Sequence, residues 1–188
     1  MSNKDPEELK ARLDAFVGQP MGGLSTAPDP VNVPMIRHWV DALDDQNPIY
    51  LDESAASAGR FGGLVAPPAM LQTWTMGRPK IQGLAERGGA PTTFETNPIS
   101  VLDDAGYTAT RATDSELEFE RYLAPGDELK SSSVVESISD EKKTALGPGF
   151  FVTWVTTYTD AKDQIVGRQL FRVLKFKPAD PSPPGEDS

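Results

Sequence analysis

The amino-acid sequence predicts an α+β fold in which a curved antiparallel sheet surrounds one short apolar helix. The second half of the chain holds strand-like segments at 115–122, 128–139, 150–158 and 165–176, which turn sequences separate, and we expect them to form a meander. In the first half, two prolines open the apolar segment 69–76. A helix that is hydrophobic on most sides has to be covered, and the sheet is the element available for this.

Length and composition limit the possible functions. The 188 residues suffice for one domain with its own core, and 18 basic against 28 acidic residues give a net charge of −10. This balance argues against a nucleic acid as partner, although an anionic small molecule can still bind at a local patch. No apolar run approaches the ~18 residues that indicate a membrane span, so no membrane partner is expected.

The missing residue types restrict the chemistry further. The sequence contains no cysteine, which excludes disulfides, thiolate metal sites and a thiol nucleophile. Together with a first segment that lacks the apolar centre of a secretory signal, this predicts a cytoplasmic protein. The single histidine is His38. Chemistry that depends on an imidazole therefore has to use His38 or a residue of another chain.

Three parts of the chain differ in character. Residues 1–30 combine a charged helix, predicted over 6–17, with a loop. Residues 31–177 form the main domain. Residues 178–188 are rich in proline and are expected to form a disordered tail or the beginning of a linker.

Within the main domain, residues 77–114 show no sustained period, apart from a weak strand signal at 94–101 that Pro98 interrupts. A connection of this length is usually functional or mobile. Two interpretations stay open: a surface excursion, or a segment that lines the mouth of a pocket for a bulky group.

A helix is predicted from Pro34, because proline fits the first helical turn. His38 lies off its apolar stripe and is interpreted as a surface residue. Asp52 is positioned to cap a second, short helix over 53–58. The apolar residues at helical spacing that are expected to face inward in the first helix are Ile36, Trp39, Val40 and Leu43.

Chemistry is expected between these helices and the apolar segment. Asp44-Asp45-Gln46-Asn47-Pro48 ends the first helix, since the residue before a proline is pushed out of the helical conformation. Gly59, Gly62 and Gly63 then form a hinge before the apolar helix. Polar side chains are thus held between segments that are expected to be buried.

Over roughly residues 34–177, this order of segments resembles the MaoC-like (hydratase 2) family of hot-dog folds. The resemblance rests on Asp45-Gln46-Asn47-Pro48-Ile49-Tyr50, on Ala66-Pro67-Pro68-Ala69-Met70 and on Leu146-Gly147-Pro148-Gly149-Phe150-Phe151. In that family an Asp and a His together activate a water that adds to a trans-2-enoyl thioester. The resemblance implies a hot-dog fold and an enoyl-CoA hydratase reaction, with a CoA thioester as substrate and neither metal nor cofactor.

The sequence departs from the family motif at its decisive position. Asp45 and Tyr50 occupy the Asp and His positions, and a phenol with a pKa near ~10 is a weak base at neutral pH. No residue is therefore assigned a catalytic role. Ala69 stands where the family has its oxyanion-hole glycine. The resemblance implies four substrate-binding candidates: Asn47, Tyr50, Ala69 and Met70.

The Asn-Pro-x-Tyr form of the motif is especially similar to the MaoC-like domain in the larger subunit of heteromeric bacterial steroid side-chain enoyl-CoA hydratases. This implies a MaoC-like partner subunit that supplies Asp and His, in a heterodimer or a dimer of heterodimers, and an acyl-CoA with a bulky acyl group such as a steroid side chain. Two alternatives remain: a stand-alone hydratase that uses Asp45, and an acyl-CoA-binding module without catalysis.

Overall fold

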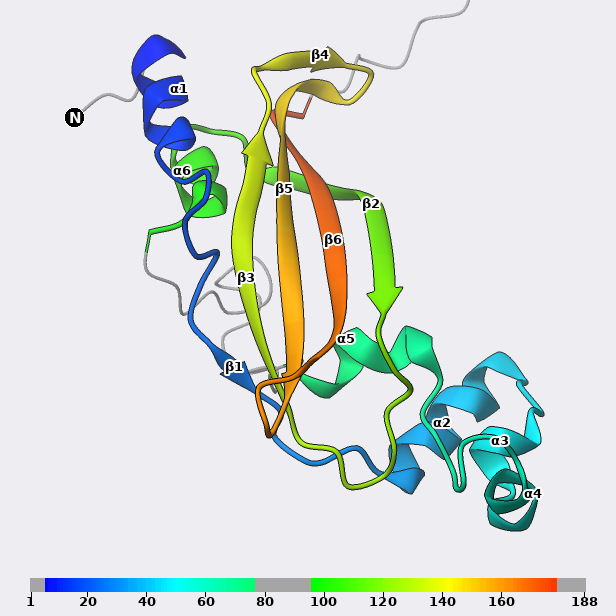
Figure 1. The fold of residues 1–188 in the computed structure, drawn as a ribbon. Coiled ribbons are helices and arrows are strands. Elements are labelled where there is room, and N and C mark those ends of the chain that lie inside the picture. The colour runs from blue at the N-terminus through cyan, green and yellow to red at the C-terminus, as the bar shows by residue number, and fades with distance from the viewer. Residues whose placement is uncertain (1–5, 77–95, 179–188) are drawn as a thin grey trace, which may run out of the picture.

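The computed structural model describes residues 6–76 and 96–178, and Figure 1 shows their arrangement. Long strands form one sheet, and short helices lie at its two ends, so the predicted α+β class is confirmed. In chain order the elements are α1 (Pro6–Asp14), β1 (Ser25–Thr26), α2 (Val33–Leu43), α3 (Pro48–Leu51), α4 (Glu53–Ala58), η1 (Pro68–Met70), α5 (Leu71–Trp74), α6 (Pro98–Asp104), β2 (Ala109–Phe119), β3 (Leu129–Ile138), β4 (Lys142–Thr144), β5 (Gly147–Asp160) and β6 (Ile165–Phe176).

The sheet is antiparallel, with the strand order β1-β3-β5-β6-β2, and β4 pairs with the start of β5. The predicted meander is correct for β3, β5 and β6. It is wrong for β2, which pairs with β6 at the far edge and not with β3. The link over residues 120–128 carries the chain from one edge of the sheet toward the other (Figure 1).

Two short strands replace segments that were expected to be loop or turn. β1 lies in the predicted loop of residues 1–30 and pairs with β3. β4 lies in the predicted turn at 140–143 and pairs with Gly147–Gly149 of β5. Both strands are too short for an alternating pattern to be recognised, which is why the sequence does not reveal them.

Helix α2 begins where Asn32 caps it: its side-chain oxygen accepts a hydrogen bond from the backbone N–H of Met35 at 3.0 Å. Ile36 and Val40 are fully buried, as predicted, and His38 is exposed, also as predicted. Leu43 was expected to face inward but is 64% exposed. It is the last helical residue, and the left-handed conformation of the following residue turns the chain away there.

Two predicted helices are shorter than expected, because α1 ends at Asp14 and α5 ends at Trp74. α4 matches the prediction, and the Asp52 carboxylate caps it by accepting from the N–H groups of Ser54 and Ala55 at 2.9 and 3.0 Å. The weak strand signal at 94–101 was wrong for its described part, because α6 begins at Pro98 behind a capping box formed by Asn97. α6 and the first half of β2 also occupy much of 96–114, whereas 77–95 lie outside the described residues.

Buried apolar side chains form two clusters on the inner face of the sheet, the face that the helices cover. One cluster joins α2, η1 and α5 to one end of the strands, and the other joins α1 and α6 to the opposite end. The N-terminal helix α1 therefore packs, through Leu9 and Leu13, on the sheet that belongs to the main domain. None of the helices in the described ranges has the length and apolar character that a membrane crossing requires.

Helix α5 reaches the sheet at Gly167 of β6. A β-carbon built on Gly167 would lie 2.6 Å from Leu71 Cδ2 and 2.6 Å from the carbonyl oxygen of Glu118. Both distances are shorter than van der Waals contact, so any larger residue would push the helix or the neighbouring strand away. A glycine is required at this position because of close approach.

Gly167→Ala should lower the free energy of unfolding by about 1–3 kcal/mol, the usual cost of overpacking a core. Urea unfolding followed by circular dichroism measures this. Gly23→Ala is the matched control, because a β-carbon there meets no atom within 4 Å. Equal stability of the two variants would contradict the close approach of α5 and β6.

Candidate functional site

The segment between α2 and α3 forms a compact polar turn. Asp45 is half-buried, and its carboxylate accepts a hydrogen bond from the backbone N–H of Asn47 at 3.0 Å. The Asn47 side chain in turn accepts from the N–H of Ile49 at 3.2 Å and caps α3. Both side chains are exposed enough to meet a ligand, but each already has a structural hydrogen bond that shapes the turn.

Tyr50 is held within the apolar cluster beneath this turn. Its exposed fraction is 8%. Burial in the first place, and the nearby Tyr122 and Asp45 in addition, raise the pKa of the Tyr50 phenol above its ordinary value of 10.0. The phenol is therefore neutral at physiological pH. In this state it can donate a hydrogen bond but cannot take a proton from water.

Backbone hydrogen bonds hold the start of the central helix, formed by η1 and α5, between this turn and the loop after β2. The N–H of Val65 donates to the carbonyl of Ile49 at 3.3 Å, and the N–H of Ala66 donates to the carbonyl of Leu123 at 2.7 Å. Of the predicted substrate-binding residues on the helix, Ala69 is exposed and Met70 is fully buried. A direct contact of either residue with a substrate stays a prediction.

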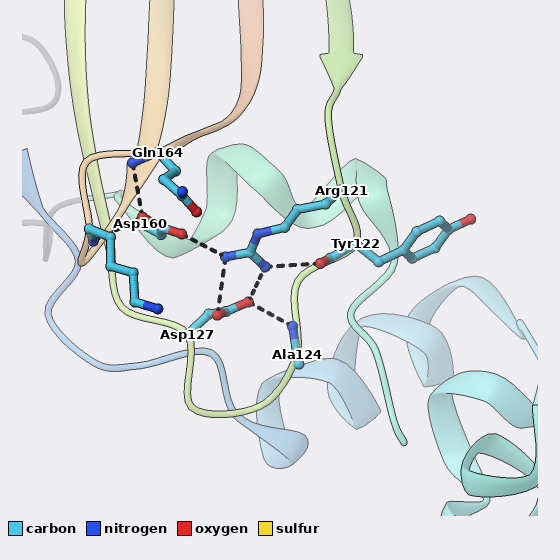
Figure 2. Close-up of polar contacts among 7 residues, drawn as sticks. Arg121, Tyr122, Ala124, Asp127, Asp160 and Gln164 are labelled. Atoms are coloured by element: carbon cyan, nitrogen blue, oxygen red, sulfur yellow. Dashed lines mark hydrogen bonds and ion pairs between the residues drawn. The ribbon is translucent and has the colours of Figure 1, made fainter. Parts of the chain in front are cut away.

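The loop that receives Ala66 is fixed by an arginine that the sequence did not single out. Figure 2 shows Arg121 between Asp127 of its own loop and Asp160 at the β5–β6 turn. Its guanidinium donates to both oxygens of Asp127, at 2.7 and 3.2 Å, to Asp160 at 3.2 Å and to the carbonyl of Tyr122 at 3.1 Å. We call Arg121, Asp127 and Asp160 the arginine clip.

The arginine clip also holds an aromatic contact next to Tyr50. The ring of Tyr122 points away from the guanidinium (Figure 2) and packs on Phe61, with ring centroids 4.4 Å apart. Phe61 belongs to the glycine hinge, so this contact joins the hinge to the loop after β2. The clip thereby fixes the position of an aromatic wall beside the buried Tyr50.

The Asp160 carboxylate is stabilised in its charged form. Hydrogen bonds from the backbone N–H of Gln164, then that of Lys162, and then the charge of Arg121 lower the pKa of Asp160 below 3.8, whereas burial acts in the opposite direction. The backbone donors lie at 3.0 and 2.9 Å. The β5–β6 turn and the loop before β3 are thus joined by an ionised side chain.

Other candidate groups lie elsewhere. His38 takes part in none of the contacts described above for the Asp45–Tyr50 turn. Within residues 6–76 and 96–178, no group of three or more His, Asp or Glu side chains is suited to hold a metal. A cavity of about 740 Å³ is lined by α1, by Tyr107 and Phe150, and by the turn between β3 and β4. It contains none of the predicted site residues and lies at the α1 end of the sheet (Figure 1).

Comparison with known proteins places the chain in a family. A profile described as "FAS1-like, dehydratase domain region" matches residues 15–169. The chain belongs to this dehydratase-region family.

Two curated proteins are similar to this chain. It is 47% identical to the "probable enoyl-CoA hydratase alpha subunit" of Thermomonospora curvata, over 92% of this chain and 53% of that protein. It is 44% identical to the "3-oxo-4,17-pregnadiene-20-carboxyl-CoA hydratase alpha subunit" of Mycobacterium tuberculosis, over 81% of this chain and 47% of that protein. The chain therefore spans about half the length of these relatives.

Solved structures confirm the hot-dog fold and the resemblance to MaoC-like proteins. A chain in the crystal structure of the ChsH1-ChsH2 complex from Mycobacterium tuberculosis is 38% identical, with a TM-score of 0.76 and full coverage of both chains. A protein titled "MaoC-like dehydratase" is 23% identical and shares the fold, with a TM-score of 0.58 over 87% of this chain and 43% of that one.

The arginine clip predicts a specific response to acid. A carboxylate with a lowered pKa stabilises the fold above its ordinary pKa near 3.8, and this contribution is lost as the pH falls through the lowered value. Arg121→Gln removes one cause of the lowering. The midpoint of acid unfolding, followed by circular dichroism, should therefore move to higher pH.

Arg168→Gln is the matched control, because its ion pair with Glu120 at 3.2 Å lies on the exposed surface. Surface pairs of this kind contribute little to stability. If both variants unfold at the acid midpoint of the unmodified chain, the proposed contribution of the arginine clip is wrong.

Proposed function

We propose that this chain is the pocket-forming subunit of a heteromeric enoyl-CoA hydratase, and that a MaoC-like partner supplies the catalytic Asp and His. The observation that carries the proposal is Tyr50. A buried, neutral phenol stands where the MaoC-like motif has its histidine. Water needs a base when it attacks an enoyl thioester, so the base comes from another chain.

The comparisons support the same division of labour. The two curated relatives are both named as alpha subunits of hydratases, and the most similar structure reported above is titled as a complex. A name of this kind applies to a protein about twice as long as the matched segment. Activity, substrate and partner are therefore proposed for this chain from the likeness together with Tyr50.

An unpaired strand edge supports a partner of the same fold. β2 ends the strand order, and its second edge has no partner strand in the described part of the chain. Almost every residue of β2 is exposed, including Phe119 at 44%. Proteins normally cover or pair such edges. We propose that a hot-dog partner adjoins this chain in a heterodimer or a dimer of heterodimers.

The proposed reaction adds water to a trans-2-enoyl-CoA, with the hydroxyl going to the β-carbon and a proton to the α-carbon. It requires neither metal nor cofactor. Ala69 is the first residue of the central helix with an N–H to offer to the thioester oxygen, because Pro67 and Pro68 have none. We propose a bulky acyl group, which the likeness to a pregnadiene-carboxyl-CoA hydratase alpha subunit supports.

Reconstitution with an Asp/His-bearing MaoC-like subunit tests the proposal. The isolated chain should not hydrate enoyl-CoA, and co-expression should give activity that is lost when the partner's histidine is replaced. Tyr50→Phe in this chain should change kcat/KM by less than about twofold, since the phenol is not the base. Hydration is measured by the loss of enoyl thioester absorbance.

Three other results would identify an alternative. Normal turnover by the isolated chain would contradict the proposal, and a large further loss in Asp45→Asn would then indicate a stand-alone hydratase. Affinity for CoA thioesters without turnover in any pairing would indicate a binding module. Asp41→Asn is the control for Asp45→Asn, because Asp41 is an exposed residue of α2.

A further inference from the structure

The hydroxyl of Tyr50 lies at the surface of its apolar cluster, close to Tyr122. Tyr50 is 8% exposed, and its hydroxyl forms no hydrogen bond with a described residue. The oxygen is not fully enclosed either, because Trp74 Nε1 is the one fully buried side-chain atom in the described ranges that lacks a hydrogen-bond partner. The hydroxyl therefore reaches the surface, near the half-buried Tyr122, which packs on the same cluster.

The ring of Tyr122 anchors the glycine hinge beside this surface. The hinge, residues 59–63, contains three glycines, and Gly62 has a φ of 71° that glycine adopts without strain. Glycines leave the backbone many conformations, so contacts of other side chains have to select one. Phe61 makes such contacts: its ring lies 4.4 Å from the Tyr122 ring and 4.6 Å from the guanidinium carbon of Arg60. The hinge is thus held where Tyr122 is held.

The arginine clip fixes Tyr122 in turn. Tyr122 lies outside the strands, in the link between β2 and β3, and its carbonyl accepts a hydrogen bond from Arg121 at 3.1 Å. The guanidinium forms four hydrogen bonds in all, and the other three go to the two carboxylates of the clip (Figure 2). A guanidinium bound in this way is held in one plane, because its N–H groups form a rigid fork. Arg121 therefore ties the backbone of Tyr122 to the β5–β6 turn.

We propose that Arg121 is a positioning residue for acyl-CoA binding: it holds the Tyr122 ring in the wall that the substrate contacts beside Tyr50. This inference rests on the proposed function. Arg121 itself does not touch the substrate, since its donors are engaged with the clip and with the Tyr122 carbonyl. The Tyr122 ring points away from the guanidinium, toward the hinge and the Tyr50 cluster (Figure 2).

A wall of this kind acts on substrate binding and not on the chemical step. Its contacts are those of aromatic area and shape, which the bound substrate and the transition state share. Contacts of equal strength in both states lower KM and leave kcat unchanged. The proposed base also belongs to the partner subunit, so a displaced Tyr122 leaves the proton transfer intact. Loss of the clip should therefore appear in KM alone.

The test measures KM and kcat of the reconstituted complex at neutral pH, far above the range in which Arg121→Gln is expected to unfold. Arg121→Gln and Tyr122→Leu should each raise KM by roughly threefold to tenfold, the worth of one aromatic contact, and leave kcat within about twofold. The double variant should have the KM of Tyr122→Leu alone, because Arg121 acts through Tyr122. Asp127→Asn breaks the clip from its other side and should reproduce the rise in KM.

Arg168→Gln is the matched control and should keep both constants. It removes an arginine whose exposed ion pair with Glu120 lies directly before Arg121 in the chain. A role in stability alone would lower the folded fraction, and hence kcat per total protein, without a change in KM. A fall in kcat with unchanged KM in Arg121→Gln and Asp127→Asn would therefore overturn the inference. Multiplied effects on KM in the double variant would also overturn it, because Arg121 would then act independently of Tyr122.

Binding separates failure of this inference from failure of the proposed function. Saturated acyl-CoA thioesters cannot be hydrated, and isothermal titration calorimetry measures their Kd for the chain with and without its partner. If no pairing hydrates enoyl-CoA, the proposed function fails. A Kd that Arg121→Gln and Tyr122→Leu raise, without a further rise in the double variant, would then still support the role of Arg121. An unchanged Kd, or no binding to the unmodified chain in any pairing, would overturn it.

Discussion

Leu71 packs against Gly167 at a distance that leaves no room for a β-carbon, and the other features of the fold follow from this contact. It sets α5 directly on the sheet. Ala66, which precedes the central helix, therefore meets the loop after β2. The arginine clip can then hold that loop against the β5–β6 turn. Tyr50 is buried because the same cluster closes over it. A looser helix would separate all of these elements together.

The candidate turn keeps its shape without the chemistry that the motif normally carries. Asp45 and Asn47 each accept a hydrogen bond from a backbone N–H two residues further along. These bonds depend on short side chains with an oxygen, and not on the residue at position 50. An aromatic alcohol can therefore replace an imidazole while the turn persists, because the base is not part of the framework that holds the turn.

Local signals were sufficient for some elements and insufficient for others. The Asp52 cap is a contact within three residues, and the sequence predicted it together with the bounds of α4. Apolar patterning likewise predicted β3, β5 and β6. The place of β2 was not predictable, because nearly all of its residues are exposed and no alternation indicates its partner. The arginine clip was missed for a different reason: Arg121 and Asp160 lie 39 residues apart, so no local pattern indicates their contact.

In the candidate site, the sequence identified Tyr50 as the residue that departs from the motif. The identity of the residue at one position was enough for this inference. It did not identify the pair Ser133 and Thr156, whose hydroxyls lie 2.8 Å apart on the inner face of the sheet. Ser133 and Thr156 occupy alternate positions of their strands, and serine and threonine at such positions usually indicate a solvent-facing side. Only the position of the helices reveals that this face is the inner one.

The division of the interior into two apolar clusters has a consequence for cooperativity. Each cluster has its own helices, and β5 and β6 contribute side chains to both. Regions with separate packing open with separate free energies, which amide hydrogen exchange detects as distinct protected units. We therefore expect the end with α1 and α6 and the end with α2 and α5 to open as two such units, which β5 and β6 connect.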